Sequence, residues 1–135
     1  MMQFLLFILL LQIISSQQPI KSEVDLSGTW QDKKANNEWT ISQNGVNIEI
    51  VNPRGVKLQG IFDGKRIKYI DQTVLIDATG PICRPFIGQA FEFPAVLKLS
   101  KGGTKLERKT PDTITKGTCT IRIGQSHPVV LTHGK

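Results

Sequence analysis

The chain has 135 residues and a formal net charge of +6, and its length is that of one domain with its own core. The positive charge is concentrated after Thr79, where nine Lys and Arg residues occur with only three acidic residues. This basic stretch lacks interleaved aromatic residues, so nucleic acid is not an expected partner. It would instead attract an anionic glycan, a lipid or an acidic protein, or serve only to solvate the surface.

The first sixteen residues differ from the rest of the chain. Phe4–Leu11 reads FLLFILLL and is followed by Ser15 and Ser16. A run this short cannot cross a hydrocarbon core, which needs about 20 helical residues, but it matches a secretory signal with small residues at the cleavage site. We therefore predict a signal peptide over 1–16 and a secreted, single-domain protein over 17–135. The alternatives are a buried helix and an uncleaved anchor. No second apolar run occurs, so no membrane span is expected after cleavage.

The two cysteines, Cys83 and Cys119, both lie in the predicted mature part. In an oxidising compartment an isolated pair usually bonds, so we predict a Cys83–Cys119 disulfide, with two free buried thiols as the alternative. The sequence has no C-x-x-C motif and no clustering of His with Cys. Neither a metal site nor a cofactor is therefore expected.

Apolar and polar residues alternate repeatedly along the predicted mature part, and helical periodicity is almost absent. Val46, Ile48 and Ile50, for example, are separated by single polar residues, which is typical of a half-buried antiparallel strand. The same pattern predicts eight or nine strands, at about 27–32, 38–43, 46–51, 56–62, 65–70, 73–77, 94–100, 104–110 and 117–124, with a short extra strand at 129–131.

Tight turns join these predicted strands, with Asn44-Gly45 and Asp63-Gly64 as the clearest examples. Short strands with such turns indicate an all-β, antiparallel up-and-down meander. Because closure removes exposed strand edges, we expect the meander to close into a barrel, with a flattened sandwich as the alternative. The predicted aliphatic interior is lined by Val46, Ile48, Ile50, Leu58, Ile67, Val74 and Ile76.

The segment 78–93 interrupts this rhythm. It reads ATGPICRPFIGQAFEF and contains Phe86, Phe91 and Phe93. Irregular segments of this length are uncommon in compact domains and are often functional. Two interpretations remain open. The phenylalanines either plug one end of the barrel, held in place by Cys83, or form a lid over a ligand.

The start of the predicted mature domain, Leu26-Ser27-Gly28-Thr29-Trp30, resembles the first strand of the calycins, the group that contains lipocalins and avidins. Glu38-Trp39-Thr40-Ile41 and the turn after it are more similar to the first hairpin of an avidin-type barrel. The resemblance implies a barrel in which Gly28 permits close backbone approach and Trp30 closes the floor. Both implied roles are structural.

Residues suited to catalysis are few. The histidines, His127 and His133, lie near the C-terminus, and no G-x-S-x-G motif accompanies them. Asp63, Asp71 and Asp77 lie at predicted turns or strand ends, where Asp ordinarily stabilises turns. We therefore do not expect an enzyme.

Two functional hypotheses follow. In the first, the barrel binds a small apolar ligand, Tyr69 supplies a polar contact, and Phe86, Phe91 and Phe93 guard the mouth. In the second, the interior is filled and the protein is a structural or protein-interaction module that acts through a basic outer face. A void of about 300 Å³ or more would favour the first hypothesis, and a packed interior the second.

Overall fold

The computed structural model describes residues 24–123 and 128–134. The predicted signal peptide, its cleavage site and His127 therefore lie outside the described residues. Within the described ranges, no helix is long and apolar enough to span a membrane.

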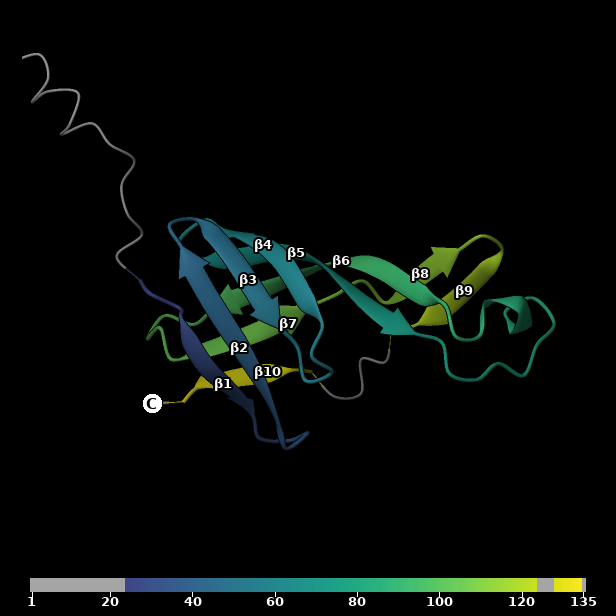
Figure 1. Ribbon diagram of the computed structural model, residues 1–135, viewed down its shortest axis with the longest axis horizontal. Coiled ribbons are helices and arrows are strands. Elements are labelled where there is room, and N and C mark those ends of the chain that lie inside the picture. The colour runs from purple at the N-terminus through teal and green to yellow at the C-terminus, as the bar shows by residue number, and fades with distance from the viewer. Residues whose placement is uncertain (1–23, 124–127, 135) are drawn as a thin grey trace, which may run out of the picture.

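Eight of the strands in the described residues form a closed antiparallel barrel (Figure 1). The first seven follow one another around the wall, and the last closes the barrel between β7 and β1. This confirms the predicted all-β barrel. The strands are β1 (Gly28–Asp32), β2 (Asn37–Asn44), β3 (Asn47–Val51), β4 (Lys57–Phe62), β5 (Arg66–Val74), β6 (Ala90–Leu99), β7 (Lys105–Lys109) and β10 (Val130–His133).

Alternation along the strands fills most of the interior with apolar side chains. The buried core includes Trp30, Ile41, Ile48, Ile50, Leu58, Phe62, Ile67, Leu97, Leu106 and Leu131. One end of the barrel is closed by Trp30, which is fully buried and donates its indole N–H to the backbone oxygen of Leu26 at 2.9 Å. The ring of His133 stacks on Trp30 with 4.4 Å between centroids. We call this the closed end.

Gly28 lies beside the same stack. Its φ is 131°, and a Cβ placed there would lie 2.9 Å from Nε2 of His133. Glycine therefore allows the start of β1 to pass close to the ring that covers Trp30.

A smaller unit projects from the end of the barrel where β5 ends and β6 begins (Figure 1). It consists of the hairpin β8 (Thr113–Lys116) and β9 (Cys119–Arg122) and of the segment 75–89, which contains the short 3-10 helix η1 (Arg84–Phe86). We call these residues the side lobe. The predicted disulfide is confirmed, because Cys83 and Cys119 join the segment to the hairpin.

Phe86 and Phe91 pack against each other at this lobe, with 6.2 Å between their ring centroids in an edge-to-face arrangement. In the β8–β9 turn, a Cβ on Gly117 would lie 2.8 Å from Cζ of Phe86, so the close approach requires glycine. Lys116 donates from Nζ to the backbone oxygen of Ala90 at 2.8 Å. The buried residues of the lobe, Ile114 and Cys119, belong to the same apolar cluster as the barrel core.

Several predicted strand boundaries are wrong. Strand β5 continues through Val74, and 75–77 leave the barrel, so 73–77 is not a separate strand. Strand β6 begins at Ala90, which makes the end of the predicted irregular segment 78–93 part of the wall. The strand 113–116 was not predicted, and it pairs with 119–122 outside the barrel.

Three residues expected in the interior are exposed. Val46 is 49% exposed because it belongs to the β2–β3 turn, where Asn44 pairs with Asn47. Val74 is 37% and Ile76 86% exposed because β5 leaves the barrel wall at this point. Alternation places a side chain inside only where the strand is part of the closed wall.

Candidate functional site

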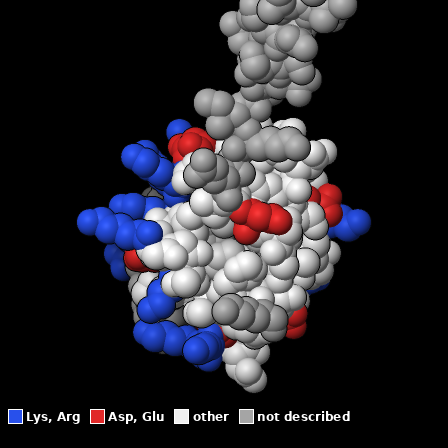
Figure 2. Space-filling view, turned by 90° about the vertical axis from the view of Figure 1, so that its left-hand side faces the viewer, with Lys and Arg blue, Asp and Glu red and all other residues white. Residues whose placement is uncertain are grey.

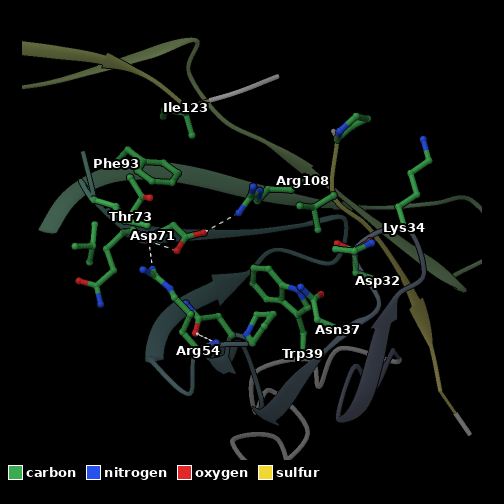
Figure 3. Close-up of a pocket in the computed structure, with 18 residues that line it drawn as sticks. Asp32, Lys34, Asn37, Trp39, Arg54, Asp71, Thr73, Phe93, Arg108 and Ile123 are labelled. Carbon is green, nitrogen blue, oxygen red and sulfur yellow. Dashed lines mark hydrogen bonds and ion pairs between the residues drawn. The ribbon is translucent and has the colours of Figure 1, made fainter. Parts of the chain in front are cut away.

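The end of the barrel opposite Trp30 opens into a cavity of about 590 Å³, which we call the mouth cavity (Figure 3). Strand β1 ends there, at Asp32, and β2 begins there, at Asn37. Charged, polar and apolar side chains share the lining, which includes Asp32, Lys34, Asn37, Trp39, Arg54, Asp71, Thr73, Phe93, Arg108 and Ile123.

The inward register of two strands places charged side chains at the foot of this cavity. Asp71 follows Ile67 and Tyr69 on β5 in steps of two residues, and all three are buried. Arg108 follows buried Leu106 on β7 in the same way. Because alternate residues of a strand share one face, the rule that buries the aliphatic side chains also turns Asp71 and Arg108 inward.

Asp71 is the centre of a buried hydrogen-bond network. Its Oδ2 accepts from the Tyr69 hydroxyl at 3.3 Å and from Nη1 of Arg108 at 3.2 Å. Its Oδ1 accepts the backbone N–H of Gln72 at 2.7 Å. The guanidinium of Arg108 also lies 5.9 Å from the centre of the Trp39 ring, within reach of a cation–π contact. The three hydrogen bonds to Asp71 offset the free-energy cost of burying its carboxylate.

The environment keeps Tyr69 protonated. Burial raises the pKa of its hydroxyl, and the negative charge of Asp71 raises it further. The hydroxyl therefore donates a hydrogen bond to Asp71 at every physiological pH. Tyr69 is thus a fixed donor at the foot of the cavity rather than an acid–base group.

Two buried polar atoms beside the cavity have no partner among the described residues. They are Nε1 of Trp39, a donor, and Oδ1 of Asn37, an acceptor. Both residues are on the inward face of β2, two positions apart, and Figure 3 shows their side chains next to each other. Leaving such a group unpaired costs about 1–3 kcal/mol. An unpaired donor beside an unpaired acceptor therefore calls for an explanation.

The rim of the mouth cavity is slightly positive. Arg54 donates from Nη2 to the backbone oxygen of Gln72 at 2.6 Å. Its turn is shaped by Asn52, whose Oδ1 accepts the backbone N–H of Arg54 at 3.0 Å. With Lys34, Arg54 and Arg108 against two carboxylates, the lining suits a neutral or singly negative molecule.

Among the described residues, no three His, Cys, Asp or Glu side chains are grouped as a metal site requires.

The four residues predicted to bind a ligand are divided between two places. Tyr69 is 4% exposed and reaches the mouth cavity through Asp71, while Phe93 is 3% exposed and lines it. Phe86 and Phe91 pack at the side lobe and are not among the lining residues.

The prediction that Asp71 stabilises a turn or strand end is wrong, because Asp71 lies within β5 and faces inward. Asp63 does stabilise a turn: its Oδ1 accepts the backbone N–H groups of Lys65 and Arg66 at 2.9 and 2.8 Å. Sequence reasoning also missed Asn37, Trp39 and Arg108. Extending the two-residue alternation from the apolar positions into the polar ones would have identified this set.

Comparisons of the chain with family models, with curated proteins and with solved structures give no match. The calycin resemblance of the first hairpin therefore remains a prediction, and the function is argued from the geometry of the site.

Proposed function

We propose that this protein is a secreted, non-catalytic binding protein that holds a small polar molecule in the mouth cavity. The observation that carries the proposal is the unpaired donor and acceptor of Trp39 and Asn37 beside a cavity of about 590 Å³. That volume lies within the range of about 300–1,000 Å³ that is typical of small-molecule sites.

The chemistry of the lining favours a polar ligand over the apolar one first expected. Aliphatic and aromatic side chains fill the part of the barrel nearer the closed end. The space that remains is bordered by Asp71, Arg108 and the polar residues of β2. A carboxamide or similar group offers an acceptor to Nε1 of Trp39 and a donor to Oδ1 of Asn37. Asn37 is the first residue of β2, where rotation of its side chain would open both atoms to the cavity.

Secretion is part of the same proposal. The Cys83–Cys119 disulfide is compatible with an oxidising compartment, and the apolar N-terminal segment matches a secretory signal. Catalysis is not proposed, because Asp71, Arg108 and Tyr69, the charged and ionisable groups at the foot of the cavity, are hydrogen-bonded to one another.

The test is a binding screen with a panel of small carboxamides, lactams and carboxylates, with an apolar fluorescent probe for comparison. We expect saturable binding of at least one carboxamide or lactam. Trp39→Phe keeps the aromatic ring but removes the N–H, and it should weaken that binding about tenfold, the equivalent of one hydrogen bond.

Trp30→Phe is the matched control. Trp30 is paired with Trp39 across β1 and β2, but its ring contacts Leu26 and His133 and does not line the cavity, so the affinity should stay unchanged. Binding of the apolar probe alone would contradict the proposed ligand chemistry. Equal affinities of the parent and of Trp39→Phe would contradict the proposed site.

A further inference from the structure

The outer face of β4–β7 carries basic residues beside an aliphatic patch. In one row across the sheet, Arg66 on β5 lies directly opposite Lys98 on β6. In the next row, Lys68 lies between Ile61 on β4 and Val96 on β6. The third row pairs Ile70 with Pro94, so charge gives way to an apolar surface within three rows.

The aliphatic patch forms a shallow hollow of about 520 Å³ on the outside of the barrel. Ile61 and Ile70, on neighbouring strands, are each 53% exposed. Single exposed apolar residues are common, but a contiguous group bordered by polar side chains is typical of an interaction site. The outward-facing residues that line the hollow are Asn47, Gln59, Ile61, Lys68, Ile70, Pro94 and Val96.

The basic residues continue from this patch toward the closed end. Figure 2, which looks at that end, shows Lys and Arg side chains gathered along one flank of the barrel. The exposed basic residues of β5–β7 and their turns are Lys65, Arg66, Lys68, Lys98, Lys101, Lys105 and Lys109.

Few carboxylates neutralise this flank. Glu107 lies directly opposite Lys98 and forms an ion pair with Lys109 at 2.8 Å, and Asp63 accepts the backbone N–H groups of its own turn. In the part of the chain that the structure describes, the side chains of Arg66, Lys68 and Lys98 form no ion pair. Like charges directly opposite each other on neighbouring strands destabilise a sheet. Glu107, on the other side of Lys98, offsets part of the Arg66–Lys98 repulsion, and an anionic partner would offset more of it.

We propose that this outer face docks an acidic segment of another protein. The segment would place an aliphatic side chain in the hollow and carboxylates against Arg66, Lys68 and Lys98. An apolar centre with a polar border is the usual anatomy of a protein interface. The proposal is independent of the mouth cavity, because the docking face lies on the outside of the wall.

Other occupants fit this face less well. A second copy of the chain would bring the same positive charges against it. A sulfated polysaccharide would satisfy the charges but leave the aliphatic hollow open. A membrane would require apolar residues at a protruding tip, whereas Ile61 and Ile70 lie within strands of the wall.

The test uses a synthetic twelve-residue peptide with Asp and Glu residues around two leucines, titrated into methyl-labelled protein. We expect chemical-shift changes at the methyl groups of Ile61, Ile70 and Val96, and an affinity that falls as salt is added. Lys68→Glu should weaken binding about tenfold or more. Lys33→Glu makes the same charge change in the exposed β1–β2 turn and should have no effect.

Two further peptides separate the contributions: one replaces the acids by serine, and the other replaces the leucines by alanine. Both should bind more weakly than the parent peptide. The proposal is overturned if the parent peptide does not bind, if Lys68→Glu binds it normally, or if the shifts fall on mouth residues. It is also overturned if only heparin or phosphatidylserine vesicles bind this face.

Discussion

The barrel contains two buried tryptophans, Trp30 and Trp39, which lie directly opposite each other on β1 and β2, but their side chains differ in their partners. At the closed end, the indole N–H of Trp30 donates to Leu26, and His133 covers the ring. At the mouth, Trp39 is 4% exposed, but its indole N–H has no partner among the described residues. The same strand alternation buries both rings. Burial with every polar atom paired stabilises the fold, whereas burial with an unpaired donor indicates a place for a ligand.

The largest expected effect tests the closed end. Trp30→Ala removes a fully buried ring and should lower the free energy of unfolding by about 3–5 kcal/mol. Urea denaturation followed by circular dichroism would measure this loss. A variant that melts like the parent would show that Trp30 does not hold the closed end together.

The side lobe at the other end should respond mainly to the loss of its disulfide. Replacing both Cys83 and Cys119 by alanine opens a loop of sequence separation 36, and the chain-entropy model predicts a loss of about 4 kcal/mol or less. Hydrogen exchange should accelerate at β8 and β9 and stay slow around Trp30. Equal acceleration at both ends would show that the lobe and the barrel unfold as one unit.

The stability of the mouth end depends on the buried ion pair between Asp71 and Arg108. Arg108→Met leaves Asp71 buried without its cation and should cost about 3 kcal/mol, the lower end of the range for such pairs because Arg108 is 22% exposed. The double variant Arg108→Met, Asp71→Leu should recover most of that loss. If urea melts show the double variant to be less stable than the single one, the pair is not the source of the effect.

The sequence predicts the features that depend on neighbouring residues of one strand, and it does not predict those that depend on residues far apart in the chain. Alternation and turns predicted the barrel because period 2 is read within one strand, as in Ile48 and Ile50. Asp71 and Arg108 lie 37 positions apart, and each has the appearance of a surface residue until its partner is known. The β8 strand was missed because only Ile114 in it is buried, and its packing depends on the distant Cys83.

A smaller effect concerns Tyr69 and alkaline pH. Because its pKa is raised in the folded state, the neutral hydroxyl contributes stability that is fully present below the ordinary tyrosine pKa of about 10 and is lost as pH rises above it. Tyr69 is the only tyrosine, so tyrosinate absorbance reports on it alone. Tyr69→Phe should remove this part of the pH dependence. Normal ionisation near pH 10 in the folded protein would contradict the buried network.

The most direct measurement follows the two indole N–H signals in a nitrogen–proton correlation spectrum, since the chain has only two tryptophans. Trp30→Phe and Trp39→Phe assign them. On titration with a carboxamide that binds, the Trp39 signal should move as its N–H gains an acceptor, while the Trp30 signal stays in place. Saturable binding that leaves the Trp39 signal unmoved, or that moves the Trp30 signal instead, would contradict the assignment of the mouth as the binding end.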